Sequence, residues 1–161
     1  MKPEAFDRLF DEHAPALLAF LTYRLGDRPT AEDVLADTFE RALRKRTRFD
    51  PRRGNPKAWL YAIALNLVRD HARRQVVAER ALARAAAGQR EASDELGYGV
   101  ELRHTVAEAL QVLTEDEREA ISLRYGADLT VPEIAKLSGV PVSTIEGRVS
   151  KALRKLRAEL G

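Results

Sequence analysis

Hydrophobic residues recur at helical spacing along most of this chain, and no stretch shows the apolar–polar alternation of a β-strand. Between residues 6 and 25 this spacing predicts a helix that Pro15 either kinks or divides in two. Thr30 is the expected N-cap of a second helix, which runs to about residue 43. A third helix is predicted from about residue 57 to residue 74. The first half of the chain is therefore expected to be helical throughout.

The stretch from residue 130 to residue 157 predicts a helix, a tight turn and a longer basic helix. Pro132 suits the first turn of the first helix, Gly139 ends it, and Pro141 opens the second. The second helix then carries an apolar stripe of Ile145, Val149, Ala152, Leu153, Leu156 and Leu160. A solvated helical hairpin is the alternative, but a small residue, a turn glycine and an early aliphatic residue in this order favour a DNA-reading helix-turn-helix.

A polar, acidic and glycine-containing stretch over residues 89–99 marks a boundary between two domains. The Ala-rich residues before it, 76–88, are compatible with a helix. After it, the sequence Thr114–Glu117 predicts a capping box that starts a helix ending at Gly126. We therefore expect an all-α fold with two small helical domains joined by a flexible linker: residues 1–75, the linker 76–99, and a helix-turn-helix domain over residues 100–161.

Composition narrows the possible functions. The 161 residues are 45% hydrophobic and 32% charged, which suits an Ala/Leu/Arg-rich helical protein. Cysteine is absent, which excludes disulfides, Cys-ligated zinc and thiol sensing by this chain. The three histidines show no metal-ligand spacing, so we expect neither a metal site nor a cofactor. No apolar run approaches membrane-spanning length and the start of the chain lacks the apolar core of a signal peptide, so a cytoplasmic location without membrane insertion is expected.

Charge is divided unevenly along the chain. Lys and Arg outnumber Asp and Glu by 15 to 11 over residues 1–75 and by 6 to 3 over residues 130–161. Over residues 76–129 the acidic residues lead by 11 to 6. The two basic ends are suited to contact phosphate, whereas nucleic acid should repel the acidic middle.

Two clusters in the first half carry candidate chemistry. Glu32, Asp33, Asp37 and Glu40 share much of one helix face. A metal site would need better ligand convergence, which leaves a solvated acidic face or, as we favour, a docking surface for a basic partner. Downstream, an Arg- and Asn-containing loop over residues 49–56 and the arginine-bearing helix after it have the composition that grips single-stranded nucleic acid.

Taken together, these blocks resemble a bacterial RNA polymerase sigma factor of the extracytoplasmic-function type, over residues 5–75 and 100–160. Residues 31–43 (AEDVLADTFERAL) resemble the polymerase-docking helix of the family, and residues 59–74 (WLYAIALNLVRDHARR) resemble its promoter-melting helix. Residues 113–157 resemble its helix-turn-helix domain. The resemblance implies a non-enzymatic subunit that binds core RNA polymerase and promoter DNA. It also implies an anti-sigma factor as a potential partner, although no residue identifies one.

By motif position, the resemblance assigns core-polymerase binding to Glu32, Asp33, Asp37 and Arg41. Two departures bear on this surface, because the family often has Gln at the position of Ala36 and Trp at that of Leu43. Thr30 stands where an acidic residue is common, and a regulatory phosphorylation is the alternative to a simple N-cap.

For the minus-ten element, the resemblance implies capture of a flipped base and contacts to nearby phosphates. The residues at the matching positions are Arg53, Asn55, Trp59, Asn66, Arg69, Arg73 and Arg74.

For the minus-thirty-five element, it implies a recognition helix whose N-terminal residues face base edges in the major groove. The candidates are Ser143, Thr144, Glu146 and Arg148, with Lys151 and Lys155 expected on phosphate. Glu146 replaces a frequent Lys and could accept a hydrogen bond from a cytosine amine. The alternative function is a dimeric helix-turn-helix regulator that binds duplex DNA without polymerase.

Overall fold

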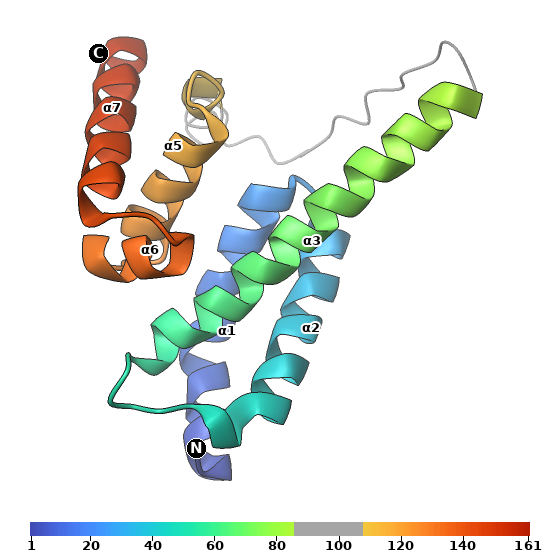
Figure 1. Cartoon of the computed structure of the whole chain (residues 1–161), viewed down its shortest axis with the longest axis vertical. Helices are drawn as coiled ribbons and strands as arrows, with labels where there is room; N and C mark the ends of the chain where they lie inside the picture. The colour runs from blue at the N-terminus through green and yellow to red at the C-terminus, as the bar shows by residue number, and fades with distance from the viewer. Residues whose placement is uncertain (86–107) are drawn as a thin grey trace. The chain divides into compact units, whose positions relative to one another are not determined.

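The computed structural model describes residues 1–85 and 108–161. The chain divides into two compact units, Met1–Leu96 and Gly97–Gly161, each described here by itself (Figure 1). Every regular element in the described residues is a helix, which confirms the all-α prediction.

Three helices form the first unit: α1 (Pro3–Leu25), α2 (Arg28–Lys45) and α3 (Pro56–Ala85), with a short 3-10 turn, η1 (Arg46–Arg48), after α2. α1 is one continuous helix, so the predicted division at Pro15 is wrong. Both Pro15 and Asp11, whose carbonyl loses its helical donor there, are exposed, so water can replace the missing N–H. Gly26, with φ of 74°, then ends α1 in the left-handed conformation that glycine adopts without strain.

The start of α2 differs from the expectation. Asp27, not Thr30, is its N-cap, because α2 begins at Arg28 and the Asp27 carboxylate accepts a hydrogen bond from the Thr30 backbone N–H at 3.0 Å. The Thr30 hydroxyl donates to the same carboxylate. A phosphate on Thr30 would meet the Asp27 carboxylate, so this geometry disfavours the phosphorylation hypothesis.

The core of the first unit lies where the three helices meet. Leu17 and Leu21 of α1, Ala31 of α2, and Leu60 and Ala64 of α3 are all fully buried. Tyr61 is also buried in this core, with its ring 5.5 Å from that of Phe20. Burial raises the pKa of the Tyr61 hydroxyl to about 12, so this side chain stays neutral.

α3 continues beyond the predicted end at residue 74. Its sequence after that point is rich in Ala and Arg, both strong helix formers, and the helix reaches Ala85. The predicted linker, residues 76–99, therefore begins inside a helix. Its remainder, residues 86–99, and the start of the predicted second domain, residues 100–107, lie outside the described residues.

The second unit contains α5 (Glu115–Ile121), the π-helical η2 (Ser122–Gly126), α6 (Val131–Ser138) and α7 (Val142–Leu160). The predicted capping box at Thr114 is present, and a second one at Thr130 starts α6 with Pro132 in its first turn. Gly139, with φ of 69°, ends α6, and Pro141 is the N-cap of α7. α6, its glycine turn and α7 are the predicted helix-turn-helix.

A small apolar core holds α7 in place. Ala152 packs with Leu110, Leu113 and Ile121, and three half-buried residues of α7 complete the cluster: Val149, Leu153 and Leu156. Leu160 was predicted on this stripe but is 53% exposed. It is the last residue of α7, one turn beyond Leu156, the last residue of the packed stripe.

Candidate nucleic-acid and protein interfaces

The outer face of α2 carries the predicted acidic surface. Val34 and Thr38 are buried on the inner face, whereas Asp33 and Asp37 are exposed on the outer face. On either side, Glu32 accepts from Arg28 at 3.1 Å and Glu40 from Arg44 at 2.5 Å. Asp33 and Asp37 have no ion-pair partner among the described residues. They are therefore the two carboxylates of α2 that a basic partner reaches without breaking an existing pair.

The same surface has uncharged and basic positions beside these carboxylates. Ala36 and Arg41 are exposed, and Leu43 is 43% exposed. Leu43, near the C-terminal end of α2, adds exposed apolar area to a helix that also carries two unpaired carboxylates. No cluster of three or more Asp, Glu or His side chains in residues 1–85 and 108–161 is arranged to hold a metal ion.

The loop before α3 is a tight turn closed by its own backbone. Asp50 accepts from the N–H of Arg52 with its side chain and from that of Arg53 with its carbonyl, each at 3.0 Å. Arg53 lies fully at the surface. The Asn55 side chain accepts from the Ala58 N–H at 2.7 Å and so caps the start of α3. The amide oxygen of Asn55 thus has a structural role, which any contact to a base must share.

Trp59 lies half-buried at the base of this loop. Its ring is 5.2 Å from that of Phe49 and tilted by 51°. This aromatic pair ties the loop to the first turn of α3 and leaves part of the indole exposed for stacking.

One face of α3 gathers most of the predicted minus-ten residues. At 100° per residue, Asn66, Arg69 and Arg73 fall within an arc of roughly 60°, with Trp59 at its edge. Asn66 and Arg73 are exposed, Arg69 is half-buried, and Arg73 lies 3.8 Å from Asp70. These side chains can contact a single nucleic-acid strand that runs along α3.

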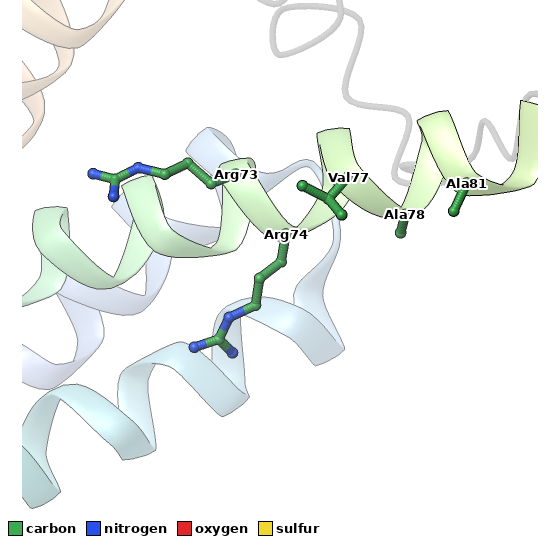
Figure 2. A pocket seen from close by; sticks show the side chains of 5 residues that line it. All are labelled: Arg73, Arg74, Val77, Ala78 and Ala81. Carbon is green, nitrogen blue, oxygen red and sulfur yellow. The ribbon is translucent and has the colours of Figure 1, made fainter.

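Arg74 lies off this face. It and Arg73 line a shallow surface pocket with Val77, Ala78 and Ala81, and Figure 2 shows their two guanidinium groups extending in different directions. The structure therefore groups Asn66, Arg69 and Arg73 but does not bring Arg74 to them.

The first turn of α7 presents three of the predicted base-reading residues. Ser143 and Glu146 are exposed and Thr144 is half-buried. Gly147 is also exposed, and a Cβ built there would have no neighbour within 4 Å. This face of α7 is therefore open enough to approach a groove closely.

Two other predicted residues of α7 are engaged within the unit. Arg148 lies 3.5 Å from the carboxylate of Asp116, and the Lys155 ammonium donates to Glu117 at 2.6 Å. Glu117 is buried and also receives the Thr114 backbone N–H in the capping box. Lys155, opposed by burial and assisted by Thr114, holds the pKa of Glu117 below its ordinary value. The Lys155–Glu117 ion pair thus connects α7 to α5.

The outward face of α7 includes two residues to which the family resemblance assigned no DNA contact. Ser150 and Arg154 are exposed on the side opposite Ile145 and Ala152, together with Ser143 and Lys151. The signal was available, because positions opposite an apolar stripe follow from helical periodicity alone.

Known families and proteins match both units. The family described as Sigma-70 region 2 matches residues 9–76, and the one described as Sigma-70, region 4 matches residues 109–158. The chain is 33% identical over 159 residues to the RNA polymerase sigma factor CarQ of Myxococcus xanthus, covering 98% of this chain and 90% of that protein. It is 31% identical over 157 residues to the ECF RNA polymerase sigma factor BldN of Streptomyces coelicolor, covering 95% of this chain but 59% of BldN.

The fold is likewise similar to a solved structure, that of the sigma factor RpoE in complex with the anti-sigma factor NepR from Bartonella quintana. The TM-score is 0.78, with 29% identity, and the match covers 98% of this chain and 97% of that chain. No helix within residues 1–85 and 108–161 has the length and hydropathy needed to cross a membrane.

Replacing Lys155 tests its structural role. Lys155→Ala should lower the free energy of unfolding of the second unit by about 1–3 kcal/mol, because the buried Glu117 carboxylate loses its charged donor. Lys151→Ala, an exposed position one turn earlier, is the control and should change it by less than about 0.5 kcal/mol. Urea unfolding followed by circular dichroism measures both; equal values for the two variants would contradict the assignment.

The same pair predicts a pH dependence. Since the folded-state pKa of Glu117 lies below its ordinary 4.5, the pair stabilises the unit above that pH, and the stabilisation is lost as pH falls through the folded value. The unfolding free energy of the wild type should therefore fall more steeply on acidification than that of Lys155→Ala. Parallel pH profiles would show that Glu117 does not depend on Lys155.

Proposed function

Because the chain belongs to the sigma-70 family of RNA polymerase sigma factors, of the extracytoplasmic-function type, we propose specific surfaces for its contacts with polymerase and promoter. Sigma factors direct core RNA polymerase to promoters at initiation and are not enzymes. The observation that carries the proposal is that one three-helix unit presents two unpaired carboxylates, Asp33 and Asp37, on α2 and an Asn/Arg face on α3. We assign polymerase docking to the first face and minus-ten strand capture to the second, in the cytoplasm and without catalysis by this chain.

The docking surface centres on Asp33 and Asp37. Carboxylates without internal partners form charge-assisted bonds with a basic partner at little reorganisation cost. Exposed Leu43 adds apolar area, although less than the Trp that is frequent in the family. Glu32 and Arg41 flank this centre and contribute at the rim, where charges affect association rate more than affinity.

Strand capture is assigned to the α3 face and the preceding loop. Trp59 is only partly buried and can offer its ring for stacking, and the exposed Asn66 can hydrogen-bond an unstacked base. Arg53, Arg69 and Arg73 are placed to contact phosphates around that base, with Asn55 fixing the loop. Arg74 contacts phosphate from a neighbouring side of α3.

Promoter reading by the second unit is assigned to the start of α7. Ser143, Thr144 and Glu146 face base edges, and Lys151 contacts phosphate. The Asp116 carboxylate orients the Arg148 guanidinium, which then reaches a base with less loss of side-chain freedom than an unrestrained arginine. Lys155 attracts phosphate more weakly than Lys151, because the Glu117 carboxylate partly screens its charge.

One further partner completes the proposal. The RpoE relative is held by an anti-sigma factor, and we propose a partner of that class for this chain. A dimeric regulator that binds duplex DNA alone is not favoured, because the family matches cover both units and no dimerisation surface is required.

Charge reversal tests the docking surface. Asp33→Arg with Asp37→Arg should abolish co-elution with bacterial core RNA polymerase in size-exclusion chromatography, because two attractive contacts become repulsive. Asp7→Arg with Asp11→Arg, an exposed pair at the same spacing on α1, is the matched control and should co-elute like the wild type. Loss of co-elution in both double variants would indicate a non-specific charge effect.

Asn66→Ala tests strand capture. It should leave closed-complex formation intact but slow opening, since the base loses a hydrogen-bonding partner only after it is unstacked. The measurement compares transcription from duplex promoters with that from promoters carrying a mismatched bubble, using Gln75→Ala, exposed on another face of α3, as control. An equal loss on both templates would refute this role.

Arg148→Ala tests base reading by α7. It should weaken promoter binding by roughly 1–3 kcal/mol and relax specificity at one base pair. Asp116→Asn should cause a smaller loss at the same base pair, because the guanidinium stays but is no longer oriented. A uniform loss across sequences would reassign Arg148 to phosphate.

A further inference from the structure

Three basic residues lie on one flank of α7, which packs beside α5 (Figure 1). At 100° per residue, Arg148, Lys151 and Lys155 fall within an arc of roughly 60°. Lys151 is exposed and has no ion-pair partner among residues 1–85 and 108–161. The other two are paired with the adjacent carboxylates Asp116 and Glu117 in the first turn of α5. Two of the three cations on this flank are therefore opposed by carboxylates before any DNA binds.

The Arg148–Asp116 pair differs from the Lys155–Glu117 pair in its exposure. Glu117 is buried, so its ion pair is part of the interior of the unit. The Asp116 side chain is 68% exposed and that of Arg148 is 23% exposed, with 3.5 Å between Nη2 and Oδ2. An exposed ion pair of this kind contributes little to stability. Its consequence therefore lies in what Arg148 can bind.

We propose that Asp116 makes Arg148 discriminate between base edges and backbone phosphates, an inference that rests on the proposed DNA-reading role of α7. A guanidinium has five N–H donors, so the Nη2 contact to Asp116 leaves others for the two acceptors of a guanine edge. The carboxylate offsets the positive charge of Arg148. An uncharged base edge keeps its hydrogen bonds there, whereas a phosphate loses Coulomb attraction and also meets the like charge of Asp116.

The consequence is a higher ratio of specific to non-specific binding. Non-specific affinity for duplex DNA comes almost entirely from phosphate contacts, so weakening one of them lowers it directly. Specific binding adds contacts to base edges, which Asp116 leaves in place. Because a genome offers many competing sites, the ratio of the two affinities matters more than either affinity alone. Asp116 is thus a specificity-determining residue that acts through Arg148.

The test measures binding of the complete chain, without polymerase, to a random-sequence duplex by fluorescence anisotropy across a series of salt concentrations. Asp116→Asn removes the carboxylate charge and keeps the size of the side chain. Glu115→Gln is the matched control, because Glu115 is an exposed carboxylate in the same turn of α5 and has no ion-pair partner in the part of the chain that the structure describes. Both variants change the net charge equally. Arg148→Ala, alone and combined with each of them, completes the double-mutant cycles.

Asp116→Asn should tighten binding to the random duplex by roughly 1.5- to 5-fold, the range that corresponds to an exposed ion pair. It should also steepen the slope of log K against log salt by about 0.9, the contribution of one phosphate contact. Glu115→Gln should change both quantities less, because Glu115 is not paired with Arg148. In the Arg148→Ala background, Asp116→Asn should have no larger effect than Glu115→Gln.

Three outcomes overturn the inference. Unchanged or weaker binding by Asp116→Asn, including binding too weak to detect in both proteins, shows that Asp116 does not oppose phosphate. Equal gains from Asp116→Asn and Glu115→Gln reduce the effect to net charge. A gain that persists in the Arg148→Ala background shows that Asp116 acts on DNA without Arg148.

Promoter binding by the holoenzyme separates this inference from the proposed function. If neither Arg148→Ala nor Lys151→Ala weakens binding of the holoenzyme to a promoter that it selects from a random-sequence pool, the DNA-reading role of α7 fails, and this inference with it. If both weaken it and any of the three outcomes above is found, the inference alone is removed.

Discussion

α3 has to pack at the centre of its unit and also carry the face assigned to DNA, and helical periodicity keeps these two tasks on separate sides. Leu60, Ala64 and Leu67 are buried at helical spacing against α1 and α2. Asn66 and Arg73 lie on the same helix but are exposed, because successive residues are turned by 100° around the helix axis. The core thereby fixes the orientation of the cationic face. A side chain on a rigid helix reaches its target with less lost freedom than one on a loop, which suits α3 to hold a strand that must first be unstacked.

The second unit uses its basic residues differently. α7 is rich in Lys and Arg, yet Arg148 and Lys155 are bound to acidic residues at the start of α5. Asp116 and Glu117 lie in the first turn of α5, where the helix dipole already favours negative charge. These two ion pairs, together with the apolar core around Ala152, fix the orientation of α7 relative to α5. The proposed DNA contacts of α7 combine Arg148, oriented by Asp116, with exposed residues of the outward face such as Ser143 and Lys151.

Periodicity and capping rules predicted the helical class, the helix-turn-helix and the capping box at Thr114, because these depend on residues close in sequence. These local rules failed where a competing residue or a residue distant in sequence determines the structure. Asp27, three residues before Thr30, is the N-cap of α2, and Leu160 at the end of α7 is 53% exposed. The Lys155–Glu117 tie joins residues 38 apart in sequence, which no local pattern reveals. The individual DNA and polymerase contacts of the site residues remain predictions.

We propose that this one chain, together with core polymerase, both selects a promoter and opens it. Permanganate probing of unstacked thymines on a promoter selected by the holoenzyme tests this most directly. We expect reactive thymines at the minus-ten element only when core polymerase and this chain are both present. Reactivity with core polymerase alone would contradict the claim. So would the absence of reactivity from a stable complex of chain, core and promoter, because the α3 face would then bind DNA without capturing an opened strand.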